Sequence, residues 1–253
     1  ANWTHIELDS NNTGVVAQQG STQVIRLGKG EVTYQGNATS KQPVYNTLTT
    51  PRGGKYQLVL PDGSKVWLNA ASSITFPTSF AQGKRVVQIT GEAYFEIARS
   101  ASAPFEVSAG TMKILVLGTH FNVMAYGDET GIQTTLLEGS VKVTEGNNTA
   151  LLLPGEQAQA DRKGNIQLVR NADMNAAMAW KNRLFWFDHD DIRTVMRQIS
   201  REYNVDVEIR GDIQRHFTGS IPRNVNVSTV FEVLQQTGGV HFTIGNEKII
   251  VTP

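Results

Sequence analysis

A pattern of apolar positions occurs twice in the C-terminal part of the chain, the second time 35 residues after the first. Each copy has apolar residues at positions i, i+3, i+4 and i+7, which mark one face of an amphipathic helix. An alternating apolar triplet follows in each copy, as a half-buried strand requires. The matched positions are Ile192 with Val227, Val195 with Val230, Met196 with Phe231, Ile199 with Leu234, Val205 with Val240, Val207 with Phe242, and Ile209 with Ile244. The pattern predicts two strand-helix-strand units, and a small duplicated unit of this kind is more often a docking scaffold than a catalytic one.

Capping residues mark the ends of both predicted helices. Asp188, with Asp191 three residues on, places carboxylates at the start of the first helix, where the positive end of the helix dipole stabilises them. Asn226 is expected to cap the second helix, and Gly238-Gly239 to end it in the left-handed conformation. The strands expected around the helices are Leu184–Phe187, Phe217–Ile221 and, after a turn at Gly245-Asn246, Lys248–Val251.

No helical period is visible from Thr4 to about Val169, where short alternating runs are separated by Gly, Asn and Asp. The strongest hairpin signal consists of Tyr56–Leu60 and Lys65–Leu68 around a turn that contains Asp62-Gly63. Short strands at close, even spacing predict a mainly β domain, built as a β-sandwich, a roll or a solenoid-like stack.

The change of hydrophobic period near Asn171 predicts the domain organisation. We expect a β-rich domain over residues 1–170, a short helical connector over residues 171–183, and a small α+β domain over residues 184–253. Within the β-rich domain, Val86–Ile89 and Glu92–Ile97 are expected to be separate strands joined through Thr90-Gly91.

Composition narrows the function classes. The 253 residues include 23 basic and 23 acidic side chains, so there is no basic excess for binding nucleic acid. Cysteine is absent, which excludes thiol catalysis, disulfides and thiolate metal sites. No apolar stretch approaches the roughly twenty residues of a membrane span, and the polar opening Ala1–Thr4 contains no signal peptide. We therefore expect this chain to be an excised part of a longer protein.

No residue pattern predicts an enzyme, a cofactor site or a metal site. Glu92 and Glu96 lie on one face of a strand and imitate a carboxylate pair, but they flank Tyr94 on the expected solvent face, where glutamate is ordinary. The five histidines show no metal-ligand spacing, and no G-x-S-x-G motif occurs. The glycines of Arg52–Lys55 lack the spacing of a phosphate loop.

Aromatic residues leave one alternative function open. Trp67, Trp180 and Trp186, with Tyr94 and Phe95, are residue types that line sugar sites, although single aromatics at strand spacing are more often part of a core. The alternative is therefore a carbohydrate- or cell-wall-binding β module.

Short motifs in the β-rich part, taken as a set and in their order, resemble those of FecR-type anti-sigma regulators. The motifs are Thr50–Leu58, Leu60–Ala70, Gly91–Ile97, Pro104–Val107, Leu117–Val123 and Leu137–Val141. The C-terminal repeat is similar to the short domain at the start of secretins and of TonB-dependent transducers, which FecR-type proteins also carry at their C-terminus. The resemblance extends over nearly the whole chain.

The resemblance implies a single-pass inner-membrane regulator of Gram-negative bacteria. A cytoplasmic segment would control an extracytoplasmic-function sigma factor, and a periplasmic part would receive a signal from the signalling domain of an outer-membrane TonB-dependent transducer. This chain would be the periplasmic part alone, because it contains neither the sigma-binding segment nor the membrane helix.

A strand near the chain end is the first candidate surface for such a contact. Its residues are Lys248, Ile249, Ile250 and Val251. At a sheet edge, this strand would offer free N–H and C=O groups to a strand of the partner. The alternative is that Ile249 and Ile250 fill both sides of a small sheet.

The outward face of the first predicted helix is the second candidate surface. It carries Arg193, Arg197 and Arg201 at successive intervals of four residues. The alternative is an ordinary solvated face.

Overall fold

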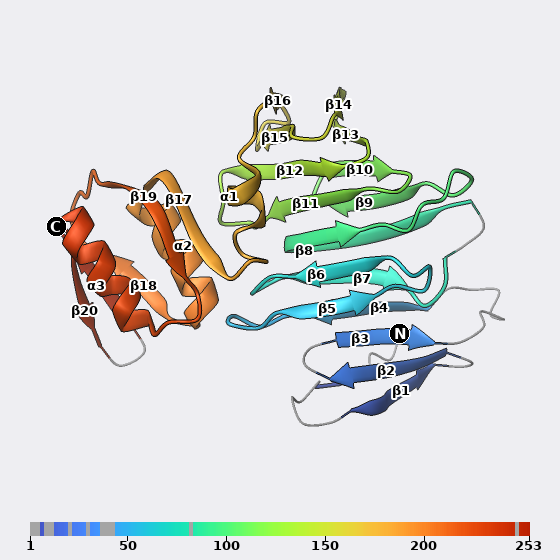
Figure 1. The fold of residues 1–253 in the computed structure, drawn as a ribbon, viewed down its shortest axis with the longest axis horizontal. Coiled ribbons are helices and arrows are strands. Elements are labelled where there is room, and N and C mark those ends of the chain that lie inside the picture. The colour runs from blue at the N-terminus through green and yellow to red at the C-terminus, as the bar shows by residue number, and fades with distance from the viewer. Residues whose placement is uncertain are drawn as a thin grey trace. The chain divides into compact units, whose positions relative to one another are not determined.

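The computed structural model describes residues 6–7, 13–19, 22–28, 31–35, 44–80, 83–245 and 248–253. The chain divides into two compact units, drawn in Figure 1. The first extends to Thr50 and continues over Lys55–Ala172, and the second comprises Pro51–Gly54 and Asp173–Pro253. The domain boundaries expected at residues 170 and 184 remain a prediction about independent folding.

The described residues of the first unit form sixteen strands and no α-helix. The strands are β1 (Gly14–Gln19), β2 (Thr22–Gly28), β3 (Glu31–Gln35), β4 (Tyr45–Thr49), β5 (Tyr56–Val59), β6 (Lys65–Leu68), β7 (Ser73–Pro77), β8 (Arg85–Glu96), β9 (Phe105–Ala109), β10 (Met112–Val116), β11 (His120–Ala125), β12 (Gly131–Glu138), β13 (Val141–Glu145), β14 (Asn148–Leu152), β15 (Gln157–Asp161) and β16 (Ile166–Val169). The mainly β character predicted from the sequence is confirmed.

These strands belong to two sheets that share β8. The first sheet has the order β1-β2-β3-β5-β6-β8-β11-β12-β15-β16, and the second has the order β4-β7-β8-β9-β10-β13-β14. Most neighbours are antiparallel, whereas β3 with β5 and β8 with β9 are parallel. Figure 1 shows the strands stacked like rungs, so the first unit is a layered stack with its core between the sheets.

A bend at Gly91 allows β8 to belong to both sheets. Its first half pairs with β7 and β9, and its second half pairs with β6 and β11. Gly91 has φ +78°, and a Cβ atom there would lie 2.7 Å from the Ser72 Cα. The expectation of two separate strands was wrong, because the glycine bends the strand without interrupting it.

Alternating side chains of β8 fill the core of the first unit. Ala93, Phe95 and Ile97 are buried, and the ring of Phe95 stacks on that of Phe121 with 4.9 Å between the centroids. The expected solvent position of Tyr94 was wrong, since its side chain is only 5% exposed. The ring of Trp67 lies against it, with 5.5 Å between the two centroids.

The second unit contains the predicted duplication. Its elements are α1 (Met174–Met178), β17 (Leu184–Asp191), α2 (Ile192–Tyr203), β18 (Asp206–Ile209), β19 (His216–Pro222), α3 (Val227–Gly238), β20 (His241–Ile244) and β21 (Lys248–Thr252). Helices α2 and α3 have equal length and begin 35 residues apart, as do β18 and β20. The leading strands β17 and β19 pair with each other, and a separate sheet has the order β18-β21-β20.

The helix ends agree with the capping signals, with two corrections. The Asp191 carboxylate accepts a hydrogen bond from the Thr194 N–H at 2.8 Å, so this residue caps α2. Asp188 lies within β17 instead. Asn226 occupies the N-cap position of α3, but its side chain makes no capping hydrogen bond, and Gly239 ends that helix with φ +59°. The predicted turn residue Asn246 lies outside the described residues.

The repeat residues form the core of the second unit. Val195, Ile199, Val230 and Leu234 are at most 2% exposed, which confirms their predicted burial. A buried ion pair at 2.6 Å joins Arg223 to Glu202, and the guanidinium of Arg223 also lies over the Phe185 ring. Both helices therefore pack their apolar faces into one shared core.

Candidate functional site

The C-terminal strand β21 lies in the middle of its sheet. It pairs in parallel with β18 and antiparallel with β20, so both of its edges are occupied. The expectation that Lys248, Ile249, Ile250 and Val251 form an edge strand was therefore wrong. The order of strands depends on long-range pairing, which the position of a strand near the chain end does not reveal.

The two faces of β21 differ in exposure. Ile249 and Val251 point into the core, whereas Ile250 is half-buried on the opposite, outward face. The register places Ile250 between Glu208 of β18 and Thr243 of β20. This arrangement agrees with the alternative in which Ile249 and Ile250 lie on opposite sides of a small sheet. Ile250 remains partly accessible.

A charged group surrounds Ile250 on the outward face. The Glu208 carboxylate pairs with Arg210 at 2.8 Å and also with Lys248. Hydrogen bonds from Arg210 and Lys248 lower the pKa of Glu208 to about 2. The outward face thus consists of an apolar side chain beside a fixed group of charges.

Strands β18 and β20 are the edges of this sheet. In β20, the Phe242 N–H points away from β21 and donates to the Gln235 side-chain oxygen at 2.8 Å. Because alternate amides of an antiparallel strand point the same way, the Ile244 N–H is also directed outward. The Ile244 side chain is 59% exposed. At the edge of β20, the Ile244 N–H is therefore directed toward a possible partner strand, whereas the Phe242 N–H is already used by Gln235.

The three arginines of α2 lie on the side of the helix away from its apolar face. Arg193 is exposed, whereas Arg197 and Arg201 are half-buried. The Arg197 guanidinium donates to the Thr194 hydroxyl at 3.0 Å. Since the apolar face of α2 shares a core with the inward face of β21, the structure does not bring the arginines together with Ile250.

Of the two glutamates considered as a carboxylate pair in the first unit, Glu92 belongs to a hydrogen-bond network. Asn69 and Asn122 donate their side-chain N–H groups to the two oxygens of Glu92, at 2.8 and 3.0 Å. Burial raises the pKa of Tyr94 to about 12, and the nearby charges of Glu96 and Glu138 add to the rise. These contacts give Glu92 a structural role.

The aromatic residues do not form an exposed platform. Phe95 and Trp180 are buried, and Trp67 packs against Tyr94.

Two exposed histidines of the second unit, His189 and His216, stack with 4.2 Å between their ring centroids. Within the described ranges, no group of three or more His, Cys, Asp or Glu side chains could hold a metal ion. Within the same ranges, no helix is long and apolar enough to cross a membrane.

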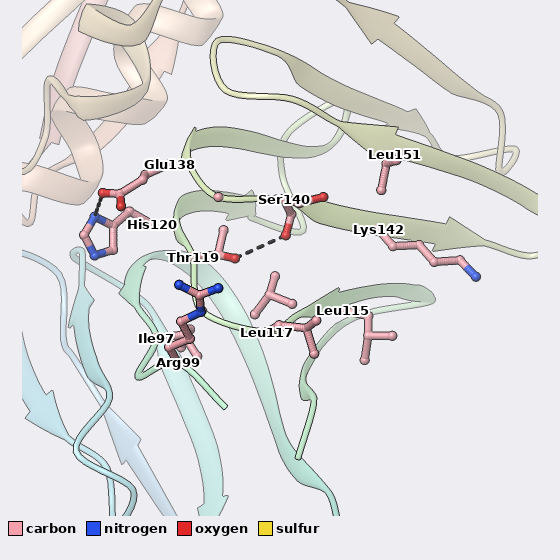
Figure 2. Close-up of a pocket in the computed structure, with 13 residues that line it drawn as sticks. Ile97, Arg99, Leu115, Leu117, Thr119, His120, Glu138, Ser140, Lys142 and Leu151 are labelled. Atoms are coloured by element: carbon pink, nitrogen blue, oxygen red, sulfur yellow. Dashed lines mark hydrogen bonds and ion pairs between the residues drawn. The ribbon is translucent and has the colours of Figure 1, made fainter. Parts of the chain in front are cut away.

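A surface groove of about 690 Å³ lies in the first unit, and the sequence analysis did not predict it (Figure 2). It is formed where the chain passes from β10 to β11 and from β12 to β13, together with side chains of β13 and β14. Each of these passages leads from one sheet to the other. The groove therefore lies where the two sheets are joined.

Two glycine turns shape the groove. A Cβ atom at Gly118 would lie 2.7 Å from the Arg99 Cα, and one at Gly139 would lie 2.9 Å from the Gly118 carbonyl oxygen. The Thr119 hydroxyl donates to the Ser140 carbonyl at 3.1 Å and links the two turns. The similar triplets Leu117-Gly118-Thr119 and Glu138-Gly139-Ser140 were the only sequence signal for this site.

The groove has a polar end and an apolar end, as Figure 2 shows. At the polar end, the His120 Nδ1 and a Glu138 oxygen are 3.1 Å apart. At the other end, Leu115, Leu117 and Leu151 are 39%, 50% and 61% exposed. Such exposed leucines, gathered in one hollow, are typical of a binding surface.

Comparison with known proteins agrees with this architecture. The sequence profile described as "FecR protein" matches residues 46–142, and that described as "FecR, C-terminal" matches residues 184–251. No curated protein matches the chain significantly.

Two crystal structures from Parabacteroides distasonis ATCC 8503, at 2.50 and 1.65 Å resolution, are similar to the chain. Both are described as a candidate anti-sigma factor, and both are 27% identical to the chain. The first has a TM-score of 0.77 over 83% of this chain and 99% of that one. The second has a TM-score of 0.76 over 81% and 98%.

The chain thus shares its architecture, a β-rich stack followed by a small α+β unit, with two structures described as anti-sigma factors. The two profiles together match well over half of the sequence, and the chain belongs to the FecR family. The resemblance stated from the sequence motifs is confirmed.

Proposed function

We propose that this chain is the periplasmic part of a membrane-anchored anti-sigma regulator. In this proposal it receives a signal by direct contact with the signalling domain of an outer-membrane TonB-dependent transducer. The complete protein would pass the signal through a membrane helix to a cytoplasmic segment that controls an extracytoplasmic-function sigma factor. Membership of the FecR family and the anti-sigma description of the similar structures support this role.

The surface of the β18-β21-β20 sheet is the observation that carries the proposal. Strand β20 has an available edge with the exposed Ile244, and the outward face offers Ile250 beside the charges of Glu208 and Lys248. Edge pairing supplies backbone hydrogen bonds, and an apolar side chain with a charged rim supplies specificity. The transducer contact is therefore assigned to β20 and this face, in place of the backbone of β21.

The carbohydrate-binding alternative has less support. An exposed aromatic platform is its usual requirement, and the buried Phe95 and Trp180 do not supply one. Arg193, Arg197 and Arg201 remain a second proposed contact surface on α2.

A paired binding experiment distinguishes the two functions. The full chain is immobilised and exposed to the periplasmic signalling domain of the transducer whose gene lies beside its own, and in parallel to a glycan array. We expect retention of the signalling domain and no glycan binding. Glycan binding without retention of any neighbouring transducer's domain would replace the signalling function with the alternative.

A further inference from the structure

The apolar surface of the groove continues across the outward face of the second sheet. The paired registers of β8, β9, β10, β13 and β14 place one residue from each strand in a single row. The row consists of Val86, Glu106, Leu115, Lys142 and Leu151. Its three apolar members are all at least 38% exposed. Since neighbouring strands are about 4.8 Å apart, the row is roughly 19 Å long.

Two cations lie beside these leucines. Arg99 and Lys142 both line the groove and are exposed, and neither has a hydrogen bond or ion pair to another residue of the described part. The acidic residue of the groove, Glu138, lies at the other end, where one of its oxygens is 3.1 Å from the His120 Nδ1. The groove therefore presents two exposed cations without a hydrogen-bond or ion-pair partner in the described part, next to exposed leucines.

We propose that this groove and row bind a segment of a partner protein that carries carboxylates among apolar side chains. The leucines would receive the apolar side chains, while Arg99 and Lys142 pair with the carboxylates. A small molecule could fill the groove, but it would leave the exposed row outside the cavity uncovered. The length of the row therefore favours a protein segment over a small amphiphilic anion.

This site is independent of the contact proposed for the transducer. It lies entirely in the first unit, whereas β20 and Ile250 belong to the second. The chain would thus have two binding surfaces, and loss of one would leave the other intact.

Fluorescence anisotropy with the full chain tests the proposal. The probe is a labelled octapeptide in which Leu and Asp alternate, and the comparison peptides have Lys in place of Asp or Ser in place of Leu. We expect binding of the Leu-Asp peptide alone, weakened by added salt because the carboxylates are attracted by exposed cations. Equal binding of the Ser-Asp peptide, or preference for the Leu-Lys peptide, would overturn the proposal.

Charge reversal locates the binding. Lys142→Glu should weaken binding of the Leu-Asp peptide at least tenfold, and Leu117→Ser should weaken it to a similar degree. Lys113→Glu is the matched control, because Lys113 is exposed on the same face of β10 as Leu115 but does not line the groove. It should change the affinity less than twofold. Equal losses in Lys142→Glu and Lys113→Glu would show a general charge effect and overturn the site.

Dodecanoate serves as the small-ligand arm of the same experiment. It should compete poorly with the peptide, since it cannot cover the row. Tight dodecanoate binding with no peptide binding would assign the groove to a lipid-like anion and overturn the proposal. Circular dichroism melting verifies that each variant is folded, and Lys142→Gln replaces Lys142→Glu if the latter unfolds.

Discussion

At the residue scale, the paired positions of the repeat carry the stability of the second unit. Ile199 and Leu234 occupy equivalent places in α2 and α3 and are both buried. Truncating either one to alanine removes buried methyl groups and leaves a cavity, so we expect a loss of about 2–5 kcal/mol. Urea denaturation of the full chain measures the loss. Val233→Ala is the control, because that residue of α3 is 38% exposed and should change stability by about 0.5 kcal/mol or less. A loss below about 1 kcal/mol for Leu234→Ala would contradict the assigned core.

The Glu208 carboxyl offers a second residue-scale test. Hydrogen bonds from Arg210 and Lys248 lower its pKa from the ordinary 4.5 to about 2. A lowered pKa means that the ion pairs favour the folded state above about pH 4.5, and that this contribution is lost as the pH falls toward 2. An NMR titration of the carboxyl carbon should therefore show a midpoint near 2, and both Arg210→Ala and Lys248→Met should raise it. A midpoint at the ordinary value in the wild-type chain would contradict the hydrogen bonds from Arg210 and Lys248 to Glu208.

At the element scale, the bend of β8 depends on one glycine. Gly91→Ala places a Cβ against Ser72 and also requires a positive φ, which alanine rarely adopts. Gly63→Ala is the matched control, because Gly63 also has positive φ, at +82°, but has open space around its Cβ position. We expect Gly63→Ala to cost about 1–2 kcal/mol and Gly91→Ala to cost about 1–3 kcal/mol more. Thermal unfolding of the two variants compares them, and equal losses would show that the close approach to Ser72 is unimportant.

The edge position of β20 predicts how the transducer contact responds to proline. Ile244→Pro removes an outward N–H that β21 does not use, so the sheet should stay folded. We expect it to bind the transducer's signalling domain at least tenfold more weakly than Ile244→Val does, as measured by calorimetric titration. Ile250→Pro differs, because it changes the central strand and should unfold the sheet. Equal affinities of the folded Ile244 variants would move the contact away from this edge.

Local patterns in the sequence predicted which helices and strands form. They predicted less well which strands lie next to one another in a sheet. The helical spacing of Ile192 and Val195 identified the buried face of α2, since this spacing depends on contacts within one turn, although the capping signal at Asp188 placed the start of the helix too early. The position of β21 between β18 and β20 depends on pairing between residues far apart in the chain, and the sequence analysis placed it wrongly at an edge. The groove was missed for a similar reason, because Gly118 and Gly139 come together only when both sheets have formed.

At the scale of the whole molecule, each of the two units carries a different proposed binding surface. The first unit is a large β-stack with a groove lined by exposed cations and leucines, and the second is a compact duplicated unit with the sheet edge β20. The proposed reception of a signal by protein contact would account for the features of both units.

Hydrogen exchange of the full chain, alone and with an excess of the neighbouring transducer's signalling domain, tests this account most directly. Because edge pairing would occupy outward amides, the account predicts slower exchange in His241–Ile244 and in the adjoining outward face around Ile250. Exchange in the groove of the first unit should stay unchanged. Unchanged exchange throughout β20 and β21 in the presence of excess transducer domain would contradict the central claim.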